Sequence, residues 1–294
     1  MEKAVYHLPG LFEFYEFYQK FLPIYREKTE YFYDWCQIGS LYGAPADCLW
    51  AGGRVSTGNA DPRQVLALTE EYGLSARLTF SNSLLRPEHL KDPKCNRLCA
   101  LFGAEPGNGV IVHSELLLAY LKEKYPNFYF VSSTTKVLTD FEDLAAETER
   151  SDFRYVVPDF RLNKAFDRLA GLKEKRKVEF LCNECCWPGC RERKECYENV
   201  SRKNLGERCP DHICAAPEGE KGYRFSAAMK NPAFIGIRDI RETYLPMGFS
   251  QFKIEGRGLG SAMLLEFILY YLTKPEYQLP LREEMYLDSM LDLF

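Results

Sequence analysis

Short apolar runs separated by amphipathic stretches repeat along most of the chain. Apolar residues with helical spacing predict helices at 62–72, 115–124, 140–149 and 164–172. Runs rich in β-branched and aromatic residues predict strands at 36–42, 76–80, 109–113, 128–132, 154–157, 178–182, 234–237 and 249–254. Strands that alternate with helices form parallel βαβ units, and eight of them favour a closed barrel over an open sheet. The pattern therefore predicts an α/β protein with a single TIM-like (β/α)8 barrel.

Two long segments interrupt this alternation within the one predicted domain, residues 1–294. Residues 182–223 form a cysteine-rich insertion after the sixth predicted strand, and they are too many for an ordinary connection. Because active sites of TIM barrels lie on the loops that follow the strands, we expect this insertion at the barrel mouth. Residues 273–294 are expected to be a C-terminal tail with a short helix on the outside of the barrel.

Residues 8–33 are unusually aromatic and predict an N-terminal helical segment, with the helix over 11–25. The spacing places one stripe of rings on one side of that helix: Phe14, Phe17, Tyr18, Phe21 and Tyr25. Such stripes usually pack, so the helix is expected to close the bottom of the barrel. The alternative is a ring-lined surface for an aromatic substrate or for a partner.

Composition and charge are those of an ordinary globular protein, with 46% hydrophobic residues, 27% charged residues and a net charge of -4. This charge gives no overall attraction for nucleic acid, although it leaves room for a folded RNA held by a local basic patch. The longest apolar run, 262–272, contains Glu266 and is too short to span a bilayer. No stretch has the order of a signal peptide, so we expect a cytoplasmic protein with reduced thiols.

Seven of the eleven cysteines lie between residues 182 and 214. Thiolates this close together are typical of tetrahedral sulfur sites, which hold zinc or an iron–sulfur cluster. The pattern favours an iron–sulfur cluster held by four thiolates; the alternatives are a structural Zn site and a set of buried or redox-active cysteines. Cys182 alternates with Phe180 and is expected to point into the barrel. The four ligands are expected among these five residues: Cys186, Cys190, Cys196, Cys209 and Cys214.

Polar residues follow most of the predicted strands, where the strands of a barrel converge on one mouth. We predict that Asn82, Asn183 and Glu184 bind substrate there. His113 ends the third predicted strand and is a candidate general acid or base, because an ordinary histidine has a pKa of ~6.5. The alternative for His113 is a structural histidine with satisfied hydrogen bonds.

The last predicted strand carries the most specific pattern outside the cysteines. Lys253 and Glu255 alternate with apolar residues, and glycines at 256, 258 and 260 then permit a tight turn into a helix. The N–H groups at the start of that helix favour an anion, and the Arg257 guanidinium fits a carboxylate or phosphate. We predict that Arg257 binds an anionic substrate and that Lys253 and Glu255 are catalytic. The alternative is that Lys253 and Glu255 only pair with each other.

The run Phe252-Lys-Ile-Glu-Gly-Arg257 after Met247-Gly-Phe-Ser resembles the signature of peptidase family U32, the collagenase-like proteins. Residues 234–244, which precede it, and the cysteine-rich insertion are also similar to segments of that family. The resemblance covers about the last 120 residues well. The cysteine spacing and Gly258 depart from the family pattern, so the chain resembles a compact, divergent member.

The resemblance implies a TIM-like barrel with a [4Fe-4S] cluster on four cysteines. It also implies oxygen-independent hydroxylation or modification of a small molecule or an RNA base, as in the ubiquinone- and tRNA-hydroxylation proteins. From the residues and this resemblance, we expect an iron–sulfur redox enzyme with an anionic substrate or co-substrate. The alternatives are a peptidase-like hydrolase and a zinc-stabilised, non-catalytic partner subunit. A homodimer, or a heterodimer with another barrel, would suit the aromatic N-terminal segment.

Overall fold

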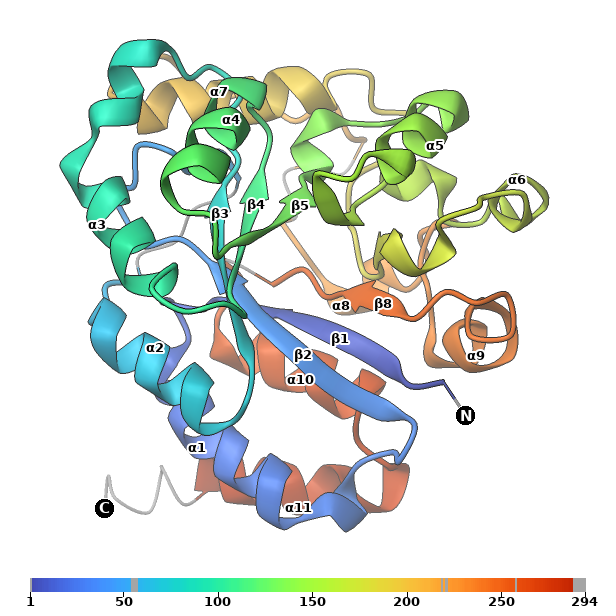
Figure 1. Ribbon diagram of the computed structural model, residues 1–294. Helices are drawn as coiled ribbons and strands as arrows, with labels where there is room; N and C mark the ends of the chain where they lie inside the picture. The colour runs from blue at the N-terminus through green and yellow to red at the C-terminus, as the bar shows by residue number, and fades with distance from the viewer. Residues whose placement is uncertain (1, 54–57, 218, 220–221, 257, 288–294) are drawn as a thin grey trace.

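Eight parallel strands form one sheet in the order β6-β5-β4-β3-β2-β1-β8-β7 (Figure 1). The computed structural model describes residues 2–53, 58–217, 219, 222–256 and 258–287. The strands are β1 (Ala4–Pro9), β2 (Cys36–Gly43), β3 (Ser75–Phe80), β4 (Gly109–Val112), β5 (Tyr129–Ser132), β6 (Phe153–Val156), β7 (Glu179–Leu181) and β8 (Gln251–Lys253). A single parallel bridge between Val156 and Val178 joins the two ends of this order. The predicted (β/α)8 barrel is confirmed.

The strand list differs from the prediction at two places. The chain begins with β1, which was not predicted, and residues 234–237 do not form a strand. β8 pairs with β1 on one side and with β7 on the other, so no further strand fits between them. Ile235 only donates one backbone hydrogen bond, to the carbonyl of Cys182 at 3.0 Å. The cysteine-rich insertion therefore follows the seventh strand of the barrel.

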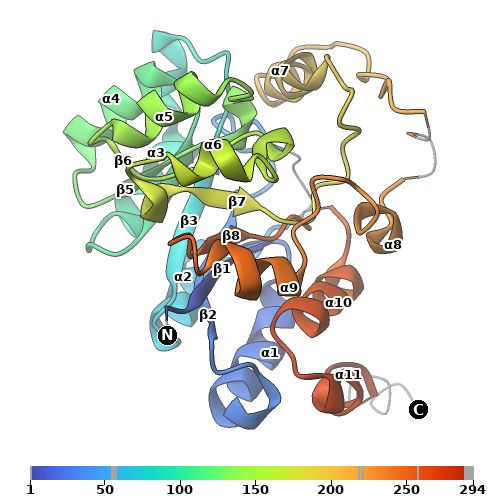
Figure 2. The same cartoon turned by 90° about the vertical axis from the view of Figure 1, so that its right-hand side faces the viewer.

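Helices connect most of the strands and cover the outside of the barrel (Figures 1 and 2). They are α1 (Tyr15–Glu27), α2 (Pro62–Glu71), α3 (Pro93–Phe102), α4 (Glu115–Lys124), α5 (Phe141–Glu149), α6 (Phe166–Ala170), α7 (Arg193–Asn204), α8 (Phe225–Ala228), α9 (Ile237–Asp239), α10 (Ser261–Tyr271) and α11 (Gln278–Arg282). Asp61 caps the start of α2, because its carboxylate accepts a hydrogen bond from the Arg63 N–H at 2.7 Å. No helix of the described residues is both long and apolar enough to cross a lipid bilayer.

The aromatic stripe belongs to α1, which connects the parallel neighbours β1 and β2. A crossover helix of this kind packs on the outer face of the sheet, so the prediction that it closes the barrel bottom is wrong. Phe17, Tyr18 and Phe21 are buried in the large core between the strands and the outer helices. Cys182 belongs to the same outer core, which corrects the prediction that it points into the barrel.

Candidate functional site

The inside of the barrel holds a buried charged layer. The Glu179 carboxylate on β7 accepts a hydrogen bond from Arg77 of β3 at 2.5 Å and lies 3.5 Å from His7 Nε2 and from Lys253 Nζ. His7 also bonds Gln251 Oε1 at 3.0 Å through Nε2. All of these side chains are nearly inaccessible to solvent. One carboxylate therefore faces two basic side chains, Arg77 and Lys253, in a region that is nearly inaccessible to solvent.

These contacts fix the charge states of the layer. Burial alone would raise the pKa of Glu179, but Arg77, then His7 and Lys253, bring it down to about 2. Burial, followed by the Arg77 cation, lowers the pKa of His7 to about 3. At neutral pH the carboxylate is ionised and His7 is neutral, so the layer carries a net positive charge.

A second layer of inward-facing side chains, which is apolar, lies two residues beyond the charged layer along the strands. It contains Tyr42, Ile111, Val131, Val157 and Leu181, which form a cluster separate from the outer core. Because side chains on the same face of a strand are two residues apart, Leu181 follows Glu179 and Lys253 follows Gln251 on the inside. The Lys253 ammonium lies 4.0 Å from the centre of the Tyr42 ring. Lys253 thus marks the boundary between the charged interior and the mouth.

A small chamber of about 30 Å³ lies at this mouth. Its wall comes from the ends of six strands and from α7: Tyr42, Thr79, Ser81, Ile111, Ser133, Thr134, Thr135, Leu181, Tyr197, Lys253 and Glu255. The hydroxyl oxygens of Thr79, Ser81 and Thr134 are buried and have no hydrogen-bond partner among the described residues. Buried hydroxyls normally have partners, so three such groups beside a cation indicate a place for a polar ligand or water.

The insertion helix α7 covers the chamber. Figures 1 and 2 show α7 beyond the carboxyl ends of the strands. Tyr197 of α7 lines the chamber, and Ser201 lies one helical turn further along. The Ser201 hydroxyl lies 3.3 Å from that of Ser83, and its carbonyl accepts from Asn82 Nδ2 at 3.1 Å. The part of the insertion that contains α7 therefore lies at the mouth, as predicted.

Three of the four residues predicted to bind substrate, Asn82, Asn183 and Glu184, bond to the chain itself. Asn82 also donates to the Leu49 carbonyl at 3.0 Å. Asn183 donates to the Glu255 carbonyl at 2.9 Å and accepts from the Glu255 N–H at 2.7 Å. The Glu184 carboxylate accepts from two backbone N–H groups and from Arg193 at 2.7 Å. These contacts hold the loops around the chamber in place, and substrate binding by these three residues stays a prediction.

The two other predicted catalytic positions lie near the chamber. Glu255 is in its wall, whereas His113 is one hydrogen bond away, with Nδ1 at 2.8 Å from the Thr135 hydroxyl. Burial, followed by Lys136 and Lys194, lowers the pKa of His113 to about 4, so its ring is neutral at pH 7. Arg257 lies outside the described residues.

The five predicted metal ligands lie in the insertion. Cys186, Cys190, Cys196 and Cys209 are half-buried, whereas Cys214 is exposed. Within the described part of the chain, no three cysteine, histidine, aspartate or glutamate side chains come together as a metal ion would require. The described donors are therefore not gathered into a metal site in this structure, and we assign no chemical step to a cluster or a zinc ion. The metal ligands stay a prediction.

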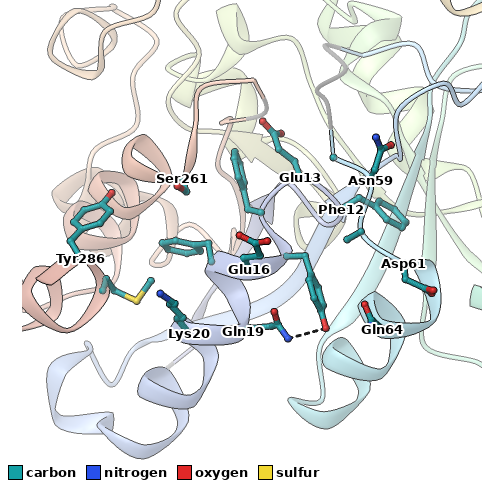
Figure 3. Close-up of a pocket in the computed structure, with 16 residues that line it drawn as sticks. Phe12, Glu13, Glu16, Gln19, Lys20, Asn59, Asp61, Gln64, Ser261 and Tyr286 are labelled. Atoms are coloured by element: carbon teal, nitrogen blue, oxygen red, sulfur yellow. Dashed lines mark hydrogen bonds between the residues drawn. The ribbon is translucent and has the colours of Figure 1, made fainter. Parts of the chain in front are cut away.

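A larger groove of about 870 Å³ lies on the outside of the barrel between α1, α2 and α10. Figure 3 shows that the carboxylates of Glu13, Glu16 and Asp61 border it, with Lys20 on one side. None of the residues of the barrel interior or of the insertion lines this groove. Its walls are acidic, which disfavours the anionic ligand predicted from the last strand. The mouth chamber is the better candidate.

Several residues of the site were missed in the sequence. Arg77 and Glu179 are charged positions inside otherwise apolar predicted strands, and this was a readable signal for a charged barrel interior. Thr79 faces the chamber from within the same predicted strand as Arg77. Tyr197 had no local signal, because its place depends on how the insertion folds back over the mouth.

Comparison with solved structures agrees with this architecture. The fold is similar to that of the U32 peptidase Mk0906, with a TM-score of 0.54 and 14% sequence identity, covering 86% of this chain and 92% of that chain. The barrel is U32-like. At this identity the likeness shows the fold and not an activity. No family model and no curated protein matches the sequence.

Proposed function

We propose that this chain is an enzyme with a U32-like barrel that acts on a small substrate bearing a carboxylate group, which binds in the mouth chamber. The observation that supports this proposal is the set of donors around the chamber. Lys253 supplies a cation, and the hydroxyls of Thr79, Ser81 and Thr134 lack partners among the described residues. A carboxylate has about four lone-pair positions, which matches one ammonium and three hydroxyl donors.

The charges favour a monoanion over a phosphate dianion. Lys253 is already 3.5 Å from the Glu179 carboxylate, and Glu255 adds a second acidic side chain to the wall. One cation that is partly balanced in this way suits a single negative charge. The volume of about 30 Å³ admits the carboxylate end of a substrate and little more.

In this proposal each predicted catalytic residue has a place. Lys253 holds the carboxylate, and Glu255 in the wall orients the ammonium. His113 is neutral at pH 7 because its pKa is about 4, so it accepts a proton rather than donates one. Its hydrogen bond to Thr135 connects it to the chamber wall. Arg257, predicted to bind the anion, follows the same strand.

Calorimetric titration with pyruvate, a small carboxylate, tests the proposal. We expect measurable binding to the wild-type protein and at least a tenfold weaker affinity in Lys253→Met. The matched control is Lys173→Met, which removes a lysine from the exposed surface pair with Glu149 and should leave the affinity unchanged. Equal binding by wild type and Lys253→Met, or no binding of pyruvate, acetate or oxalate by either, would reject the carboxylate site.

A redox role is a second candidate, supported by the seven cysteines between residues 182 and 214 and by the position of α7 over the chamber. Four of these cysteines would have to draw together to hold an iron–sulfur cluster, and the chemistry that such a cluster supplies is electron transfer. Iron and acid-labile sulfide counts on anaerobically purified protein test this candidate. About four irons and four sulfides per chain would support it, and stoichiometric zinc without iron would reject it.

A further inference from the structure

We infer that the insertion helix α7 is a movable lid, which must withdraw before substrate reaches Lys253. This inference rests on the proposed function, since it concerns access to the same chamber. The first argument is size. The covered chamber has about 30 Å³, which is room for roughly two water molecules. Small-molecule sites in enzymes usually have roughly 300–1,000 Å³. A whole substrate therefore does not fit while Tyr197 of α7 forms the roof.

The second argument is the way α7 is attached. Only three of its 12 residues are buried, and they are Arg193, Tyr197 and Ser201. Two of these three are polar, so the helix buries a single aromatic ring and no aliphatic side chain in its contact with the barrel. α10 differs, because its buried face is apolar throughout: Leu264, Leu265, Phe267, Ile268, Leu269 and Tyr271. Lifting α7 exposes little apolar surface, whereas lifting α10 would expose much.

The third argument is the nature of the contacts that hold α7 down. Near its C-terminal end, Asn204 donates to the Ala51 carbonyl at 2.6 Å, and Ser201 bonds Asn82 and Ser83. At its N-terminal end, Arg193 pairs with Glu184 at 2.7 Å. The neutral hydrogen bonds are exchanged for bonds to water on opening, so each opposes opening only weakly. The buried charges of Arg193, Glu184 and Asp159 regain hydration as they separate, which offsets the lost ion pairs. The contacts therefore fix one position of the closed helix, and they can break and form again as the helix opens and closes.

The chain on both sides of α7 permits the movement. Residues 187–192 precede the helix and residues 205–215 follow it, and neither segment contains a strand or a longer helix. Gly206 has a φ of +82°, which ends α7 in a conformation that side chains disfavour. The helix can therefore move as a unit while the eight strands and the outer helices stay in place.

A reversible disulfide lock tests the inference. The hydroxyl oxygens of Ser83 and Ser201 are 3.3 Å apart, so the double variant Ser83→Cys/Ser201→Cys places two thiols within bonding reach. The probe is acylation of Lys253 by the N-hydroxysuccinimide ester of acetic acid, which is larger than the closed chamber, followed site by site with mass spectrometry. We expect the oxidised double variant to react at least tenfold more slowly at Lys253 than wild type, and dithiothreitol to restore the rate.

The controls separate the lid from other effects. Each single variant, Ser83→Cys and Ser201→Cys, should react like wild type under the same oxidising conditions, and Lys173 serves as the exposed reference lysine in every sample. An unchanged Lys253 rate in the locked protein overturns the lid. If pyruvate binding still depends on Lys253 in that case, the proposed function stands without the lid. If the lock works but no carboxylate binds, the proposed function fails and the lid remains.

Amide hydrogen exchange on the wild-type protein gives a second measurement, which decides the matter if the disulfide does not form. A lid that opens transiently exchanges its amides faster than a helix fixed in the core. We expect the amides of α7 to exchange at least a hundredfold faster than those of α10. Equal protection of the two helices overturns the inference.

Discussion

At the scale of single residues, one carboxylate lies between two basic side chains inside the barrel. Glu179 is 2.5 Å from Arg77 and 3.5 Å from Lys253, and all three side chains are buried. Removal of one partner from a buried pair leaves the other charge without compensation, which costs more than the pair contributes. A single substitution in this charged layer is therefore expected to change the stability of the protein strongly.

We predict that Glu179→Gln lowers the free energy of unfolding by roughly 3–5 kcal/mol, because Arg77 then stays buried without a countercharge. Equilibrium denaturation in urea measures this change. The matched control is Glu2→Gln, which removes an exposed partner 3.6 Å from Arg176 and should have little effect. A double variant, Arg77→Met/Glu179→Met, should recover part of the loss. Equal stability of Glu179→Gln and wild type would contradict this account of the layer.

The pKa values of the same region predict acid sensitivity. The folded protein lowers the pKa of His7 to about 3 and that of His113 to about 4, from the ordinary value of 6.5. The unfolded chain therefore binds more protons below pH 6.5, so stability falls as the pH drops from 6.5 towards 4 and then 3. Glu179, with a folded pKa of about 2, adds a further loss below its ordinary value of 4.5.

Urea unfolding at pH 7, 6, 5 and 4 measures this loss. Each histidine whose pKa is lowered makes the free energy of unfolding change by up to about 1.4 kcal/mol per pH unit. This holds between its folded and its unfolded pKa. His113→Gln should reduce the slope between pH 6 and pH 4, whereas His212→Gln in the insertion serves as the control. A slope that His113→Gln leaves unchanged would show that His113 does not titrate as described.

At the scale of elements, the sequence predicted seven of the eight strands and the helices α1, α2, α4, α5 and α6, because each has a regular apolar period of its own. Residues 4–9 carried a readable signal for β1, since most of them are apolar. The run at 234–237 has the composition of a strand but does not form one, because β8 has no open edge for it. Both edges of β8 are already paired. The backbone of 231–236 is held by side chains and by one backbone hydrogen bond from Ile235 to the Cys182 carbonyl.

Asn163 is the side chain that holds this segment against the barrel. Its Nδ2 donates to the Leu181 carbonyl at the end of β7 and to the Ala233 carbonyl, both at 2.9 Å, in a fully buried position. We predict that Asn163→Ala lowers the free energy of unfolding by about 2–4 kcal/mol, because two buried carbonyls lose their donor. Thermal and urea unfolding measure this.

The matched control for Asn163 is Asn127→Ala. Asn127 also donates to two carbonyls, those of Gly103 and Ala104, but it is exposed, so water replaces the lost bonds. The control should therefore change stability much less. A loss of similar size at both positions would mean that burial does not set the cost.

At the scale of the whole molecule, the candidate site was only partly predictable. Lys253, Glu255 and Ser81 come together at the mouth because parallel strands end on one side of a barrel, and strand ends can be found in a sequence. The roof depends on an insertion without regular periodicity, so no local pattern places Tyr197 above the chamber. The same holds for the cysteines, whose spacing does not fix the path of the chain between them.

The weakest connection of the barrel lies between β6 and β7. Every other neighbouring pair of strands shares three or more paired positions, whereas β6 and β7 share only the bridge between Val156 and Val178. Lys177 supports this seam, since its ammonium donates to the carbonyls of Thr148 and Arg150, both at 3.1 Å. A closed barrel with one weak seam is expected to open there first.

We therefore predict that backbone amides of β6 and β7 exchange with solvent at least tenfold faster than those of β2 and β3. Lys177→Met should widen this difference and lower the free energy of unfolding by about 1 kcal/mol, because two carbonyls at the seam lose their donor. Lys173→Met, on the nearby surface, is the control and should leave the exchange pattern as in wild type. Uniform protection across all eight strands would show that the barrel behaves as one closed cooperative unit, and that the single bridge is as strong as a full ladder.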